Sequence, residues 1–326
     1  MKNKKLRIVF RVDGNKKIGM GHVMRCLALA DELKERIGCK IFFVMKNSAD
    51  SEKEVLKCGY DITANFPKSF LDIAIVSVPD IGNKYLSTIK KQVKLLVVID
   101  DSAKTQYCAD IVVKCSCVPE LSRFDRKAKG KFLIGLDYVI LNKEFQIINL
   151  RKKIINPKAK SVLITMGGSD INNLTPKIME ALKKISDIKK TVVVGPAFKN
   201  KLKPNKEYDS KYGVSNMASL MFSSDLAIVG GGITLYEVAC VGTPGIVLCQ
   251  TDYQKMEAEC FEKAGAILNL GFGKNLGEEK IAASVKVLLK DKEMRKKMSN
   301  IGKKIIDGKG AKRVVDKILD KIRKYE

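Results

Sequence analysis

The chain has very little of what most metal sites require. Its 326 residues include one histidine, His22, and its nine cysteines form no CxxC pair; the closest group is Cys108, Cys115 and Cys117. Structural zinc sites combine cysteines and histidines at short, regular spacings. We therefore expect no metal site, and the cysteines are typical of free thiols in a reducing compartment.

Long hydrophobic runs are also missing. No stretch approaches the roughly 18 apolar residues of a membrane-spanning helix. The apolar run near the N-terminus is interrupted by Arg7, Arg11 and Asp13, which makes it too short for a signal peptide. The sequence thus predicts a soluble, cytoplasmic protein without a membrane span.

Lysine and arginine outnumber aspartate and glutamate by 61 to 36, and the formal net charge is +25. The excess is lysine, 51 residues against 10 arginines, and it is spread along the whole chain. The densest clusters, at 151–153 and 295–297, look like solvated helix faces, and no nucleic-acid-binding motif accompanies them. We expect no specific nucleic-acid partner; the charge favours anionic small molecules.

Short apolar runs alternate with helical patterns, which predicts parallel sheets covered by helices. A chain of this length is expected to form two domains. The charged segment 142–160 separates two series of strands, so we predict two Rossmann-like doubly wound α/β domains, 1–150 and 151–326, facing each other across a cleft. The expected strands are Leu6–Val12, Ile41–Met45, Ile73–Val78, Leu95–Ile99 and Ile111–Val113, then Ser161–Met166, Thr191–Val194, Leu226–Val229 and Gly245–Cys249.

The single histidine lies between a glycine-rich loop and a helix, in "NKKIGMGHVMRCLALA". Gly19 and Gly21 mark a sharp strand-to-helix turn whose backbone N–H groups suit an anion. Met24 stands where a dinucleotide fingerprint needs a small residue, so a nicotinamide or flavin cofactor is disfavoured. The helix N-terminus keeps His22 neutral, as a general base must be, although a hydrogen bond to its own loop is the structural alternative.

Glycine-rich turns follow three strands of the second series. They form an expected binding surface for a nucleoside diphosphate. Glu237 would accept hydrogen bonds from ribose hydroxyls, or it would complement the helix dipole. The candidate binding residues here are Gly167, Gly168, Ser169, Gly195, Pro196, Gly230, Gly231, Gly232, Thr234, Glu237 and Gln254.

The chain resembles the UDP-sugar hydrolases of the pseudaminic acid pathway and their spore-coat polysaccharide biosynthesis relatives. The resemblance runs through "FRVDG…IGMGHVMRCLALA", "GLDY…LNKEF", "MGGSDINNLT", "VVVGP" and "GGGITLYEVACVGTP", in the family's order. More distantly the chain is similar to the lipid-linked N-acetylglucosaminyltransferase of peptidoglycan synthesis. The resemblance implies a glycosyltransferase-B fold and the hydrolysis of a UDP-linked diacetamido-trideoxy-altrose without a metal or cofactor.

Carried over to this sequence, the resemblance makes His22 the general base, with Arg11 and Asp13 matching the family's R-x-D. It makes Gly230 to Gly232 with Thr234 a phosphate loop and Glu237 the ribose ligand. An Asp13–His22 hydrogen bond is expected to orient the imidazole. The family's Asp-His-Tyr triplet is absent at Val78–Asp80, which leaves the sugar open.

Two other functions remain open on the sequence. A glycosyltransferase would use the same UDP-sugar donor with a sugar or lipid hydroxyl in place of water. A non-catalytic protein that binds nucleotide sugars or polyanions would need no base at His22.

Overall fold

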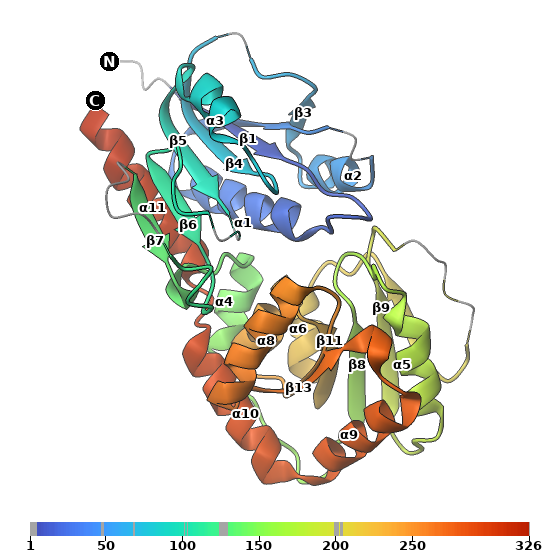
Figure 1. The fold of residues 1–326 in the computed structure, drawn as a ribbon. Coiled ribbons are helices and arrows are strands. Elements are labelled where there is room, and N and C mark those ends of the chain that lie inside the picture. The colour runs from blue at the N-terminus through green and yellow to red at the C-terminus, as the bar shows by residue number, and fades with distance from the viewer. Residues whose placement is uncertain are drawn as a thin grey trace. The chain divides into compact units, whose positions relative to one another are not determined.

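The computed structural model describes residues 5–46, 49–67, 69–100, 102, 104–123, 130–198, 202 and 205–325. The chain divides into two compact units, which are described one at a time. The first comprises residues 1–143 and 309–326, and the second residues 144–308. Figure 1 shows that each contains a sheet covered by helices.

The first unit has a parallel sheet in the order β3-β2-β1-β4-β5-β6-β7. Its inner strands are mainly apolar; every residue of β4 is buried, as expected for a strand covered on both faces. The order reverses between β1 and β4, which are neighbours in the sheet. The elements are β1 (Leu6–Val12), α1 (Gly21–Arg36), β2 (Cys39–Val44), α2 (Ala49–Lys57), β3 (Asp61–Thr63), β4 (Leu71–Ser77), α3 (Asn83–Lys90), β5 (Val93–Ile99), β6 (Ile111–Lys114), β7 (Lys131–Ile134), and α11 (Gly310–Ile322), with 3₁₀ turns at Leu136–Tyr138 and Arg323–Tyr325.

The second unit repeats the plan with the order β10-β9-β8-β11-β12-β13, and here the order reverses between β8 and β11. One apolar cluster joins the sheet to α5 and α9. The elements are α4 (Lys143–Asn149), whose first residue belongs to the first unit, then β8 (Ser161–Thr165), α5 (Leu174–Lys183), β9 (Lys189–Val194), β10 (Asp209–Tyr212), α6 (Met217–Ser223), β11 (Leu226–Gly230), α7 (Ile233–Val241), β12 (Gly245–Cys249), α8 (Asp252–Ala264), β13 (Ile267–Phe272), α9 (Glu278–Lys290) and α10 (Lys292–Ile305), with a 3₁₀ turn at Gly273–Asn275.

The last helix accounts for the main difference from the expected domain limits of 1–150 and 151–326. Helix α11 packs with α1 and β5 of the first unit instead of joining the second. The apolar face of α11 is buried, and Asp316 of α11 forms an ion pair with Arg36 of α1 at 2.6 Å. Gly310 allows the close approach, because an added Cβ would lie 2.0 Å from the carbonyl oxygen of Val139. Helix α11 therefore belongs to the unit that buries its apolar face, although it follows the second unit in the sequence.

Candidate functional site

The first group of expected site residues lies where the strand order of the first sheet reverses. His22 is the second residue of α1, which follows β1, and Ser77 is the last residue of β4. The two side chains meet, with Nδ1 of His22 2.9 Å from Oγ of Ser77. Crevices at such reversal points, outside the carboxyl ends of parallel strands, are where doubly wound folds bind ligands.

The loop before His22 is held by its own backbone. Gly19 has φ +80° and donates its N–H to the carbonyl oxygen of Asn15 at 2.8 Å. The Asn15 side chain accepts from the N–H groups of Lys17 and Ile18 at 2.8 and 3.0 Å. A Cβ on Gly21 would have no described atom within 4 Å, so protein packing does not demand glycine there. Space remains at Gly21 for close approach of a ligand to the start of α1.

The imidazole of His22 is half-buried and is held on its Nδ1 side. Nη2 of Arg25, one helical turn further along α1, lies 3.1 Å from Nδ1, and Ser77 lies on the same nitrogen. The Arg25 side chain is buried, with 7% of the residue exposed. Arg25 and Ser77 were missed in the sequence, because nothing in a helical pattern shows which buried arginine faces a histidine.

Asp13 is oriented toward different partners from the one expected. Its two carboxylate oxygens accept from the Arg11 guanidinium, each at 2.6 Å, and Oδ1 also accepts from the backbone N–H of Lys46 at 2.8 Å. Arg11 is 6% exposed, so the pair is largely removed from solvent. Among the described residues, Ser77 and Arg25 contact Nδ1 of His22 and hold the ring in place. The Asp13 carboxylate instead forms an ion pair with Arg11.

The second group gathers at the reversal point of the other sheet. Gly167 follows β8 with φ +80°, and an added Cβ would lie 3.0 Å from Oγ1 of Thr234, which is on α7 after β11. Gly195 follows β9, and an added Cβ would lie 2.3 Å from the carbonyl oxygen of Gly167. The turns after β8, β9 and β11 are therefore in direct contact, as their shared sheet edge predicts. Pro196 directly follows Gly195 in this turn.

The turn after β11 leads into the N-terminus of α7. Gly232 is the N-cap and offers no side chain to the first turn of the helix, which also has no acidic residue. The N–H of Gly231 donates to Oε1 of Gln254 at 3.3 Å, and Oε1 also accepts from the N–H of Gln250 at 2.8 Å. The side-chain amide oxygen of Gln254 thus holds the glycine loop to the loop after β12.

Gln250 is a part of this edge that the sequence did not indicate. Its Oε1 accepts from the N–H of Asn172 at 3.1 Å, and its backbone oxygen accepts from the Asn172 side chain at 3.0 Å. These bonds tie the loop after β12 to the loop after β8. Asp170 in that loop caps α5 by accepting from the N–H groups of Leu174 and Thr175 at 2.8 and 2.7 Å. Ser169 beside it is buried.

Glu237 has the properties of a ligand-binding carboxylate. It is the fifth residue of α7, beyond the first turn, where the helix dipole no longer explains it. Its side chain is half-buried, and within the described residues it makes no hydrogen bond or ion pair. Desolvation, with a smaller contribution from the charge of Glu144, raises the pKa of Glu237 to about 8. A partly desolvated carboxyl gains from hydrogen bonds that hydroxyl groups of a ligand donate to it.

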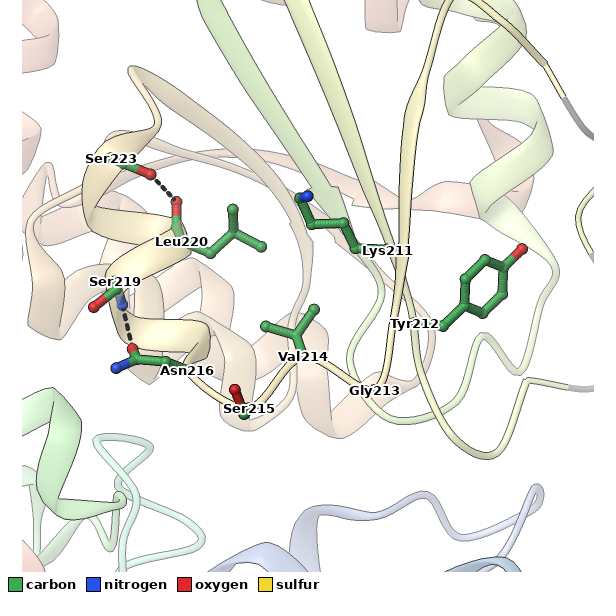
Figure 2. Close-up of a pocket in the computed structure, with 9 residues that line it drawn as sticks. All are labelled: Lys211, Tyr212, Gly213, Val214, Ser215, Asn216, Ser219, Leu220 and Ser223. Carbon is green, nitrogen blue, oxygen red and sulfur yellow. Dashed lines mark hydrogen bonds between the residues drawn. The ribbon is translucent and has the colours of Figure 1, made fainter.

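A cavity of about 660 Å³ lies along β10 and α6 of the same unit. Figure 2 shows Lys211, Val214 and Leu220 on the side between strand and helix, whereas Tyr212 points the other way. Asn216 caps α6 by accepting from the N–H of Ser219 at 2.8 Å. The loop of Gly213 to Asn216 follows β10, as the glycine turns follow β8, β9 and β11. The sequence did not indicate this cavity, because β10 carries no apolar run.

Two further features hold for the described ranges of the chain. None of their helices has the length and apolar character needed to cross a membrane. Nor do they contain three or more His, Cys, Asp or Glu side chains arranged to hold a metal ion.

Comparison with known proteins then decides the relationship. Residues 161–314 match the family model described as the glycosyltransferase family 28 C-terminal domain. The chain is 28% identical to the spore coat polysaccharide biosynthesis protein SpsG of Bacillus subtilis, over 94% of this chain and 96% of that protein. It is 23% identical to the UDP-2,4-diacetamido-2,4,6-trideoxy-beta-L-altropyranose hydrolase of Campylobacter jejuni, over 80% and 97%. The chain is a homologue of these proteins.

Two other likenesses complete the comparison. The chain is 32% identical to an uncharacterized protein of Methanocaldococcus jannaschii over 79% of its length, and it spans 58% of that relative. The crystal structure of MurG from Acinetobacter baumannii matches with a TM-score of 0.66 at 14% identity, over 97% of this chain and 100% of that one. The expected glycosyltransferase-B type of fold, with two parallel-sheet α/β units, is confirmed, as is the resemblance to the UDP-sugar hydrolases.

Proposed function

We propose that this protein hydrolyses a UDP-linked amino or deoxy sugar to UDP and the free sugar, in the synthesis of a nonulosonic acid or a surface polysaccharide. The observation that carries the proposal is the position of the candidate groups. Each set lies at the reversal point of its own sheet, where the fold binds ligands. The names of the homologues supply the substrate class, a UDP-linked sugar.

The second unit holds UDP in this proposal. The diphosphate lies against the backbone N–H groups at the start of α7, where Gly232 leaves the helix end open and the hydroxyl of Thr234 is adjacent. Glu237 accepts from the two ribose hydroxyls. The cavity beside Val214, on a loop at the same end of the sheet, is the proposed place for the base. The net charge of +25 draws the anionic nucleotide toward the protein.

Departure of UDP leaves negative charge on a diphosphate oxygen. Helix N-termini already directed at that charge stabilise it without reorganisation when the bond breaks. We propose that α7 supplies this stabilisation, together with nearby lysines, and that the reaction needs no divalent metal. In the first unit, His22 and the turn of Gly19 and Gly21 are the groups proposed to act on the sugar.

Water attacks the anomeric carbon in the proposed reaction, and His22 is the candidate for proton transfer. The general-base form of this role requires a neutral ring with an unprotonated nitrogen directed at the water. The position of His22 at the N-terminus of α1, beside the buried guanidinium of Arg25, favours the neutral ring.

UDP release from a panel of UDP-sugars, in the absence of added metal and of any acceptor, tests the proposal. The wild type is expected to release UDP and His22→Ala to lose that activity, while both bind UDP in calorimetry. Wild-type protein that binds UDP and releases none from any substrate would contradict the proposal.

A glycosyltransferase is the second candidate, because the matched family model is described as a glycosyltransferase domain. The same assay distinguishes the two functions when it is repeated with sugar and lipid-linked acceptors. A hydrolase releases UDP at the same rate with and without an acceptor. A transferase releases it only when an acceptor is present, and a binding protein releases none in either case.

A further inference from the structure

The contact between Arg25 and His22 restricts where the imidazole carries its proton. A guanidinium has five N–H donors and no acceptor. The Nη2 atom of Arg25 lies 3.1 Å from Nδ1 of His22 with an N–H directed at it. This contact is a hydrogen bond only if Nδ1 is unprotonated and accepts. A proton on Nδ1 would instead point at the N–H of a buried cation.

Ser77 does not decide between the two tautomers. Its hydroxyl, 2.9 Å from Nδ1, can rotate to donate or to accept. Ser77 is fully buried at the end of β4, so it fixes the plane of the ring in either case. Of these two contacts with Nδ1, only that of Arg25 distinguishes the tautomers, because a guanidinium can only donate.

The charge of Arg25 has a second consequence for the ring. A positive charge within hydrogen-bonding distance disfavours a further positive charge on the imidazole. The N-terminus of α1 acts in the same direction, since His22 lies in its first turn and no acidic residue lies there with it. Both effects keep the ring neutral, and a neutral ring with Nδ1 as acceptor carries its proton on Nε2.

We infer that Arg25 is a positioning residue that holds His22 as the neutral Nε2–H tautomer, so that the imidazole presents a hydrogen-bond donor. A neutral imidazole at a helix N-terminus that donates to developing negative charge is a known catalytic arrangement. Within the proposed function, the acceptor is an oxygen of the departing diphosphate. This assignment replaces the expected general-base role of His22, because a nitrogen that already carries the proton cannot take one from water. The Nε2 proton stays on the ring as a hydrogen-bond donor, and the proton lost by the attacking water passes to the solvent.

The chain's one histidine makes the test direct. Protein labelled with ¹⁵N-histidine gives a single imidazole signal set in long-range ¹H–¹⁵N spectra, whose pattern identifies the protonated nitrogen. The full-length wild type near pH 7.5 is expected to show the Nε2–H pattern. A Nδ1–H pattern in the wild type would overturn the inference, and no variant is required for that decision.

Variants then assign the cause. Arg25→Met removes the donors and the charge while keeping an unbranched side chain, and it is expected to shift the spectrum toward a mixture of tautomers or the Nδ1–H form. Arg25→Lys keeps a cationic donor and is expected to retain the wild-type pattern. Ser77→Ala is the matched control and is also expected to retain it. A shift in Ser77→Ala with none in Arg25→Met would assign the tautomer to Ser77 and contradict the inference.

The spectra do not depend on the proposed reaction, so the two ideas fail separately. If UDP release is observed, Arg25→Met is expected to lower kcat by roughly 10- to 100-fold, by analogy with the loss seen when the partner that orients a metal-bound histidine is removed. Arg25→Lys is expected to recover most of the loss. An Nε2–H spectrum in a protein that releases no UDP would leave Arg25 as assigned and reject the hydrolase.

Discussion

The substitution Glu237→Gln is expected to stabilise the fold and weaken UDP binding at the same time. In the folded protein, desolvation and Glu144 raise the pKa of Glu237 from 4.5 to about 8. Between these two pH values the folded state holds a proton that the unfolded state releases, so wild-type stability falls as pH rises. The slope for one such group is at most about 1.4 kcal/mol per pH unit. Because the carboxyl is only half-buried, we expect a total effect on the order of 1–3 kcal/mol by pH 8.

Urea unfolding at pH 5 and pH 8 measures this difference. Glu237→Gln lacks the titrating group, so its stability relative to the wild type is expected to be greater at pH 8 than at pH 5. Glu144→Gln serves as the control, since it removes the neighbouring charge and is expected to flatten the wild-type slope only in part. A Glu237→Gln variant with the same pH dependence as the wild type would refute the burial argument.

The same substitution is expected to weaken UDP binding, although it stabilises the fold. The ionised carboxylate accepts from ribose hydroxyls, and charge-assisted hydrogen bonds of this kind contribute about 1.5–3 kcal/mol. The amide is therefore expected to weaken UDP binding roughly 10- to 100-fold in calorimetry at pH 8. Glu144→Gln is expected to leave it nearly unchanged. Equal UDP affinity in Glu237→Gln and wild type would remove Glu237 from the nucleotide site.

Three other changes test separate parts of the structure. Gly195→Ala places a carbon 2.3 Å from the oxygen of Gly167, so we expect a loss of about 1–3 kcal/mol in urea unfolding together with weaker UDP binding. Gly232→Ala, whose added carbon lies no closer than 3.5 Å to another atom, is its control and is expected to leave stability within about 0.5 kcal/mol of wild type. Arg11→Met leaves the Asp13 carboxylate without its buried partner and is expected to cost about 3–5 kcal/mol, measured the same way; a loss below about 1 kcal/mol would show that solvent replaces the pair. Treatment with EDTA is expected to leave the rate of UDP release unchanged, and a loss restored by added Mg²⁺ would contradict the metal-independent mechanism.

The parts of the fold that follow from the sequence are those buried on both faces. The runs that became β1, β4, β5 and β11 are mainly apolar, and the structure places strands within two residues of the expected limits. The short edge strands β3, β7 and β10 were not predicted, because they are polar or half-exposed and depend on a neighbour for their pairing. The position of α11 was missed for a similar reason, since only packing against α1 shows which unit buries its apolar face.

In the candidate site, the sequence indicated where glycines are required, but it did not indicate which side chains form hydrogen bonds with each other. Gly167 and Gly195 lie where a turn or a close backbone approach excludes a Cβ, which is a local requirement that sequence can show. The partners of His22 and Asp13 come from residues 55 and 33 positions away along the chain, Ser77 and Lys46. Such contacts depend on strand order and register. For that reason the contacts of His22 with Ser77 and of Asp13 with Lys46 became visible only in the folded chain.

The most direct test of the central claim is a reaction run in ¹⁸O-labelled water with a UDP-sugar substrate and no acceptor, followed by mass spectrometry of the UDP. Attack of water at the anomeric carbon breaks the bond between that carbon and the diphosphate oxygen, so the account predicts that UDP is released at a rate dependent on His22 and carries no label. Label in the UDP would place the attack at phosphorus, and absence of release without an acceptor would leave a transferase or a binding protein; either result contradicts the account.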